Sequence, residues 1–166
     1  MHIAYPKVIF NFSESTGIEN WIIVDDGVMG GVSAGKFSLN KEKNGVFEGN
    51  ISLENNGGFS SVRHGFEPLQ VNAESKIVIT LKGDGKDYQF RIKDKANSYY
   101  SYITTFSTSG EWQKIEILLS DLYPSFRGQK LQMPNFYKDT LEEITFLIAN
   151  KKKESFKLVL DKIELY

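Results

Sequence analysis

Apolar and polar residues alternate along much of this chain, and the alternation has the period of a β-strand. One run places Ile77, Ile79 and Leu81 on a single face, and other runs do the same for different sets. These sets are Phe47, Gly49, Ile51 and Leu53, and Tyr88, Phe90 and Ile92. Such runs predict strands at 8–12, 21–24, 36–39, 46–53, 59–66, 76–81, 88–93, 100–106, 113–118, 144–148 and 156–166. One face of each strand is therefore expected to meet a core.

Turn residues separate these runs, and helical signals are weak. The clusters at 55–58 and 83–85 are rich in Gly, Asn and Asp, which tolerate positive φ. The segment 115–123 is expected to end in a short helical turn, and 139–143 to hold another. Neither is long enough to build a helical layer. The pattern predicts an all-β jelly-roll sandwich that forms one domain over residues 1–166.

Composition narrows the function classes. Hydrophobic residues make up 40% and charged residues 25%, which is ordinary for a globular domain. The net charge of -1 provides no field to attract a polyanion, so we expect no nucleic-acid partner. Residues 1–6 lack a secretory leader and no long apolar run is present, so we expect a cytoplasmic protein without membrane insertion. The absence of Cys excludes disulfides and thiolate metal sites.

Few residues are suited to catalysis, so we expect no catalytic residues, no metal site and no cofactor. The histidines are His2 and His64, and no Gly-x-Ser-x-Gly motif presents a nucleophile. Asp25 and Asp26 are adjacent, so in a strand their side chains would point to opposite faces. With Gly27 they predict the end of a strand and a turn, and binding of a ligand or cation is the alternative.

Arginine and aromatic residues are the other candidates. Arg91 lies with Gln89 and Lys93 on the face opposite Phe90, which makes either a binding strip or a solvated sheet face. Arg63 and Arg127 present further planar donor groups. Trp21 and Trp112 occur in apolar runs and are expected to anchor the core. The lysines at 151–153 predict a solvated hairpin tip, and the glycines at 30–31 and 57–58 predict tight turns rather than phosphate loops.

A series of short motifs in one order covers nearly the whole chain. The most distinctive is the run Asn55 to Arg63, which follows a segment rich in Asp and Gly. The chain thereby resembles the complex I intermediate-associated protein 30 family. The matching positions are Trp21, Asp25 to Gly31, Ser33, Phe47, Gly49, Ile51 to Leu53, Asn55 to Arg63, Leu81, Gly83 to Gly85, Tyr88, Phe90, Arg91, Ser101, Tyr102, Phe106, Trp112, Pro124, Phe126 to Gly128, Phe156, Leu158 and Ile163.

The resemblance implies a galactose-binding-like β-sandwich, an architecture shared with carbohydrate-binding modules. Eukaryotic members of the family are mitochondrial factors that help build the membrane arm of respiratory complex I. This chain shows no targeting extension and is similar to the short, free-standing members of the family. A shared fold does not by itself transfer a function.

Three hypotheses follow. The first is a non-enzymatic binding or assembly domain with a protein partner. The second is a carbohydrate-binding module that uses exposed aromatic residues such as Tyr99, Tyr100, Tyr123 or Tyr137, and the third is a hydrolase acting through Asp25, Asp26 or Asp84. The ligand-binding candidates, which instead could satisfy one another inside the sandwich, are Asp25, Asp26, Arg63, Arg91, Tyr102 and Arg127.

Overall fold

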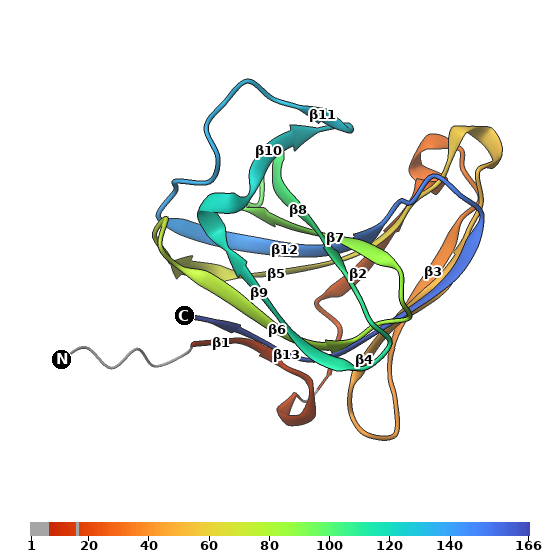
Figure 1. The fold of residues 1–166 in the computed structure, drawn as a ribbon, viewed down its shortest axis with the longest axis horizontal. Coiled ribbons are helices and arrows are strands. Elements are labelled where there is room, and N and C mark those ends of the chain that lie inside the picture. Colours follow the sequence, from red (N-terminus) through yellow and green to blue (C-terminus); the bar gives the residue numbers. More distant parts are fainter. Residues whose placement is uncertain (1–6, 16) are drawn as a thin grey trace.

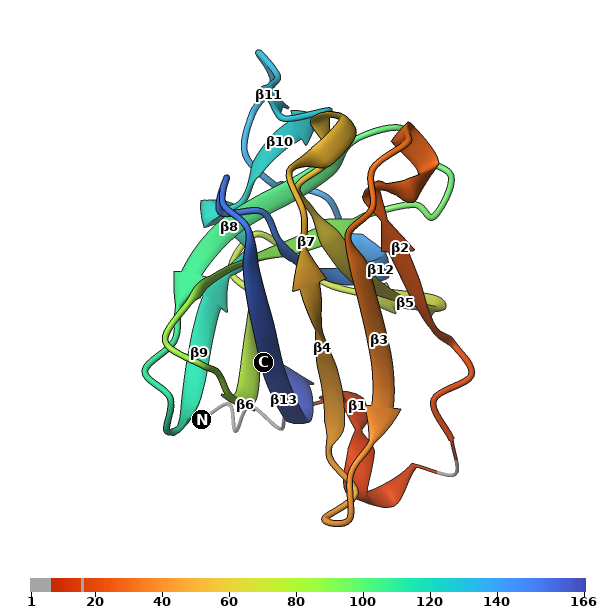
Figure 2. The same cartoon turned by 90° about the vertical axis from the view of Figure 1, so that its right-hand side faces the viewer.

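The computed structural model describes residues 7–15 and 17–166, which form two antiparallel β-sheets lying face to face (Figures 1 and 2). The six-stranded sheet has the order β3-β4-β13-β6-β9, and β1 also pairs with β13. Its strands are β1 (Lys7–Asn11), β3 (Ala34–Leu39), β4 (Gly45–Ile51), β6 (Lys76–Lys82), β9 (Trp112–Leu118) and β13 (Glu154–Leu165). Strand β13 is central because β4 pairs with its first part and β6 with its last part.

The seven-stranded sheet has the order β11-β10-β8-β7-β12-β5-β2. Its strands are β2 (Trp21–Asp25), β5 (Ser60–Gln70), β7 (Asp87–Lys93), β8 (Ser101–Ser107), β10 (Tyr123–Phe126), β11 (Gln129–Lys130) and β12 (Thr140–Ile148). Short 3-10 helices lie in the connections: η1 (Phe12–Glu14), η2 (Asp26–Met29), η3 (Glu54–Asn56) and η4 (Leu119–Asp121). The expected all-β jelly-roll sandwich is confirmed.

One cluster of buried side chains fills the space between the sheets. Ile77, Ile79 and Leu81 of β6 are fully buried, as the alternation predicted. Phe90 and Phe146 meet them from the other sheet, and their rings lie 5.3 Å apart. Burying a side chain of this size stabilises the fold by about 1.5–3 kcal/mol, so the two inner faces hold the sheets together.

Several sequence-based expectations differ from the structure. Residues 139–143 were expected to be helical, yet β12 begins at Thr140 because Thr140 and Leu141 pair with β5. Leu53 was expected to share a buried face, but β4 ends at Ile51 and Leu53 is exposed. The short strands β10 and β11 were not expected, since each is too brief to show an alternation. The helical turn after β9 is confirmed as η4.

Trp112 corrects a further expectation. Trp21 is buried in the core as expected, whereas 48% of Trp112 is exposed at the start of β9. Its phase in the strand explains this, because Trp112 alternates together with Lys114 and Glu116 and not with the buried Ile117. Within residues 7–15 and 17–166, no helix is long and apolar enough to cross a lipid bilayer.

Candidate binding face

On the outer face of the seven-stranded sheet, two arginines on separate strands lie on either side of a threonine. Val62, Phe90 and Phe146 point into the core, so their neighbours Arg63 and Arg91, and likewise Thr145, lie on the opposite face. Thr145 of β12 is the register partner of Arg63 on β5 and of Arg91 on β7. We call Arg63, Thr145 and Arg91 the arginine row. Facing Cβ atoms in a sheet lie about 5 Å apart, so the two arginine Cβ atoms lie about 10 Å apart.

The surroundings of the row are partly closed to water. Thr145 is only 8% exposed although it lies on an outer face, and Ile103 beside Arg91 is also buried. Long arginine side chains cover neighbouring surface with their methylene groups, and the flanking Arg63 and Arg91 can shield Thr145 and Ile103 in this way. Tyr123 on β10 extends the row past Ile103.

The guanidinium of Arg91 is held in place by a neighbour on the same strand. Its Nε and Nη2 donate to Gln89 Oε1 at 3.0 and 2.7 Å. Burial lowers the pKa of Arg91, and the nearby Tyr123 acts in the opposite direction. An arginine nevertheless stays charged at neutral pH, so this face presents a positioned and partly desolvated cation.

Arg63 has hydrogen-bonding capacity left over. Its Nε is buried and has no hydrogen-bond partner among the described residues. A buried donor without a partner costs about 1–3 kcal/mol, so the Arg63 side chain carries a local energetic penalty in this structure.

Among the residues that the structure describes, no carboxylate forms an ion pair with Arg63 or Arg91. Within the described parts of the chain, the ion pairs are made by lysines. Glu143 lies on the same face two residues before Thr145, but it faces Lys93 and the two side chains pair at 4.0 Å. Thr145 and Glu143 were not among the expected site residues because they occur in a mainly apolar run. Their alternation with Ile144 and Phe146 is the signal that could have revealed them.

Projecting loops flank this face. In Figure 1 the β10–β11 hairpin and the loops with η2 and η3 both project toward the top of the view, with the loops to the right of the hairpin. Figure 2 shows the η2 and η3 loops close together at one end of the sandwich. The arginine row, on β5, β12 and β7, lies on the strands between these projections.

Asp25 and Asp26 hold the loops with η2 and η3 together. Strand β2 ends at Asp25 and η2 begins at Asp26, which confirms the expected turn. Asp25 accepts hydrogen bonds from the Gly35 N–H at 2.9 Å and from the Ser60 hydroxyl at 2.5 Å. The two carboxylates have different partners and do not form a pair.

Asp26 is fully buried and joins segments distant in sequence. It accepts from the Ser33 N–H at 2.9 Å, the Ser33 hydroxyl at 2.5 Å, the Gly58 N–H at 2.6 Å and the Phe59 N–H at 3.3 Å. Burial tends to raise the pKa of Asp26, but these hydrogen bonds outweigh it and the pKa is lowered. The carboxylate is thus fully engaged within the protein.

Tyr102 and Arg127 lie away from the arginine row. Tyr102 is fully buried on the inner side of β8, with its hydroxyl 3.2 Å from that of Tyr100 and its ring against Phe136. Burial, then the hydrogen bond with Tyr100, raises the pKa of Tyr102. Arg127 is exposed at the β10–β11 turn with φ 51, over the ring of Phe126. Of the expected site residues, only Arg63 and Arg91 share one open sheet face.

The remaining candidate groups are enclosed or outside the described residues. His64 is buried against Trp21, and Asp84 accepts hydrogen bonds from the Tyr88 hydroxyl and the Lys157 N–H. Within the described ranges, no group of three or more His, Asp or Glu side chains is placed to hold a metal ion. His2 lies outside the described residues.

Comparison with known proteins assigns the family. The family model described as "Complex I intermediate-associated protein 30 (CIA30)" matches residues 10–160. The chain belongs to this family. A CIA30 relative is "Complex I intermediate-associated protein 30, mitochondrial" of Mus musculus. It is 22% identical to this chain over an alignment of 184 residues, gaps included, and the alignment covers 96% of this chain. The same alignment covers 56% of the mouse protein, so this CIA30 chain spans little more than half of the length of that relative.

Solved structures share the fold of this CIA30 chain. A family 11 carbohydrate-binding module of the Clostridium thermocellum cellulase Lic26A-Cel5E has a TM-score of 0.73 and 21% identity, covering 99% of this chain and 95% of that one. A family 11 module from the same organism, in complex with a β-1,3-1,4-mixed-linked tetrasaccharide, has a TM-score of 0.72 and 20% identity over 96% of this chain and 94% of the module. The galactose-binding-like sandwich expected for the CIA30 family is therefore confirmed.

Proposed function

We propose that this chain is a non-catalytic binding domain whose seven-stranded sheet contacts an acidic surface of a protein partner. The observation that carries the proposal is the arginine row, in which Arg63 and Arg91 flank Thr145 without a carboxylate partner among the described residues. Guanidinium groups bind carboxylates through paired hydrogen bonds, and arginine is enriched in the energetic centres of protein interfaces.

The surroundings of the row favour anion recognition. The Arg91 guanidinium is positioned by Gln89, so less side-chain freedom is lost on binding. Partial burial lowers the local dielectric constant and strengthens attraction to an incoming carboxylate. Hydrogen bonds to charged groups contribute about 1.5–3 kcal/mol each. Weaker contacts around the arginine row would supply the rest of the binding free energy.

A binding role also fits the family better than catalysis does. The mouse relative is named as a protein associated with an intermediate of complex I, which supports a protein partner. The acids considered for hydrolysis, Asp25, Asp26 and Asp84, are each occupied by hydrogen bonds from the chain itself. Our expectation of a cytoplasmic location stays a prediction, and the mouse relative is named a mitochondrial protein.

Titration of the labelled chain with an oligoglutamate peptide, observed by two-dimensional NMR, tests the proposal. We expect saturable shifts in β5, β7 and β12 that weaken as salt increases. The double variant Arg63→Gln, Arg91→Gln should bind at least about tenfold more weakly, whereas Arg127→Gln, which alters an exposed arginine elsewhere, should bind normally. Absence of binding, or equal loss in both variants, would contradict the proposal, and oligolysine serves as the charge-reversed control.

Carbohydrate recognition is a second candidate. Tyr99 and Tyr137 are 62% and 57% exposed, whereas Tyr100 and Tyr123 are half-buried. A sandwich of the same fold was solved with a β-1,3-1,4-mixed-linked tetrasaccharide, which makes that sugar the first ligand to test. If the tetrasaccharide shifts the NMR signals of the arginine row and oligoglutamate does not, carbohydrate recognition replaces protein binding as the proposed function.

A further inference from the structure

A separate pocket opens on the outer face of the six-stranded sheet, and it does not involve the arginine row. Its volume of about 430 Å³ lies within the range of about 300–1,000 Å³ that is typical of small-molecule sites. Trp112, Lys82 and Val159 line it from neighbouring strands, with polar residues of the β3–β4 turn and the β6–β7 loop around them. We call it the tryptophan pocket.

The strand register explains how the pocket forms. Trp112 of β9 faces Lys82 of β6, and Lys82 faces Val159 of β13. These residues form one row on the outer face, with Trp112 at the edge of the sheet. The β3–β4 turn and the β6–β7 loop bring Asn40 and Asp84 to this row.

Trp112 is free to contact a ligand. It is 48% exposed and lines the pocket. Among the ring pairs and cation–π pairs of the described residues, none involves the Trp112 indole. A large aromatic ring on a solvated face contributes nothing to the core, and such rings dominate binding when a ligand covers them.

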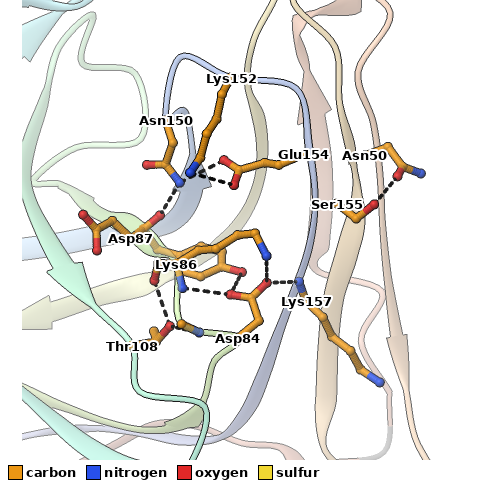
Figure 3. Close-up of polar contacts among 12 residues, drawn as sticks. Asn50, Asp84, Lys86, Asp87, Thr108, Asn150, Lys152, Glu154, Ser155 and Lys157 are labelled. Carbon is orange, nitrogen blue, oxygen red and sulfur yellow. Dashed lines mark hydrogen bonds and ion pairs between the residues drawn. The ribbon is translucent and has the colours of Figure 1, made fainter.

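The polar wall of the pocket is rigid. Asp84 accepts a hydrogen bond from the backbone N–H of Lys157 at 2.8 Å and from the Tyr88 hydroxyl at 3.0 Å. Figure 3 shows this carboxylate between the Lys86 side chain and the Lys157 backbone. Asn40 Oδ1 accepts from the backbone N–H groups of Glu42 and Asn44, which fixes the β3–β4 turn. The pocket is therefore preorganised and loses little freedom when a ligand binds.

The charges around the pocket balance. Glu42 and Asp84 oppose Lys82 and Lys157, so neither an anion nor a cation is favoured. Asp84 is occupied by hydrogen bonds from the chain itself, but the lining also supplies the Glu42 carboxylate, lysine ammonium groups and the side-chain amides of Asn40 and Asn44. This mixture suits a neutral ligand whose groups both donate and accept hydrogen bonds, as hydroxyl groups do.

We propose that the tryptophan pocket binds a neutral pyranose unit, whose apolar ring face stacks on Trp112 while its hydroxyl groups bond to the polar wall. A flat apolar surface surrounded by hydroxyl groups matches an indole ring surrounded by charge-balanced donors and acceptors. The site lies on the sheet opposite the arginine row, so it binds independently of that row.

The two tryptophans of the chain make a direct test possible. Trp21 is buried and Trp112 is exposed, so we expect iodide to quench the fluorescence of Trp112 selectively in the wild-type protein. The probes are gluco-, xylo-, manno- and galacto-oligosaccharides at millimolar concentrations, with an oligogalacturonide as the acidic counterpart. The indole N–H signal of Trp112, assigned from its loss in Trp112→Phe, provides a second measurement by NMR.

At least one neutral oligosaccharide should protect Trp112 from iodide and shift its indole signal saturably. Trp112→Ala should abolish this binding, while Tyr166→Ala, which removes an exposed aromatic residue beside Lys76 at the other end of β6, should leave it unchanged. The double variant Arg63→Gln, Arg91→Gln should also bind the sugar normally. No response to any neutral sugar, preference for the oligogalacturonide, or binding that survives in Trp112→Ala would overturn the proposal.

Discussion

Trp21 and His64 stack face to face across the β2–β5 pair, with ring centroids 4.7 Å apart and an interplanar angle of 8°. Phe10 contacts the imidazole edge-on, and Phe66 covers it further along β5. The Nδ1 atom of the ring lies 3.4 Å from the Asn20 carbonyl oxygen. Burial lowers the pKa of His64 below its ordinary value of 6.5, and the carbonyl only partly opposes this.

This enclosure predicts acid destabilisation that begins near pH 6.5. Below that pH the unfolded chain takes up a proton at His64 that the folded chain does not, so unfolding becomes more favourable. The free energy of unfolding should fall by about 1.4 kcal/mol per pH unit until the folded-state pKa is reached. Urea denaturation over a pH series measures this loss. His64→Phe should flatten the profile in that window, and equal profiles for variant and wild type would contradict the prediction.

Asp26→Asn should destabilise the fold by about 2–4 kcal/mol, because an amide places an NH2 group against donors that need an acceptor. The buried carboxylate serves Ser33, Gly58 and Phe59, so their loops should loosen together. Urea midpoints measure the loss, and hydrogen exchange of the Gly58 amide locates it. Asp121→Asn, at an exposed acid, is the matched control and should remain within about 0.5 kcal/mol of wild type.

Gly49→Ala should also destabilise the protein, by about 1–3 kcal/mol. A Cβ at Gly49 would overlap the backbone carbonyl oxygen of Ala34 on the paired strand β3, and a backbone cannot move aside cheaply. Gly27→Ala offers the contrast, since a Cβ at Gly27 meets no atom within 4 Å and its φ is not positive. Thermal unfolding of both variants tests the difference, and similar losses would refute it.

Removal of the Asp84 carboxylate should expose the start of β13. The Lys157 N–H bonds to Asp84 because β6 pairs with β13 only from Val159 onward (Figure 3). In Asp84→Ala the Lys157 amide should exchange hydrogen at least about tenfold faster, as expected for a lost bond to a charged acceptor. Asp87→Ala, which removes an exposed carboxylate nearby, should leave this exchange rate unchanged. An unaltered rate in Asp84→Ala would show that Asp84 does not hold the strand.

Alternation along single strands was enough to predict which face of β6 and β7 meets the core, because that information is local. It also placed Arg91 opposite Phe90. Alternation could not predict that Arg63 and Arg91 lie on either side of Thr145, because β5, β12 and β7 are not consecutive in the chain. The phase of β9 would have placed Trp112 outside the core, but the apolar neighbours of this residue outweighed that phase in the interpretation.

Asp26 illustrates the other limit of sequence reasoning. A conspicuous acidic residue beside glycines is compatible with ligand binding and with internal hydrogen bonding, and only three-dimensional proximity separates them. Its acceptor oxygens meet Gly58, which is 32 residues away in the chain. Loops that close over such a distance leave no periodic pattern to detect.

The central place of β13 has a consequence for biosynthesis. Strands β4 and β6 are both made long before the segment that joins them, and neither pairs with the other directly. While the ribosome is still translating the region before Glu154, the edges of β4 and β6 that will later pair with β13 have no partner and are open to chaperones or to self-association. Completion of this half of the sandwich is therefore a late, non-local event, and the cell has to shield the nascent chain until it occurs.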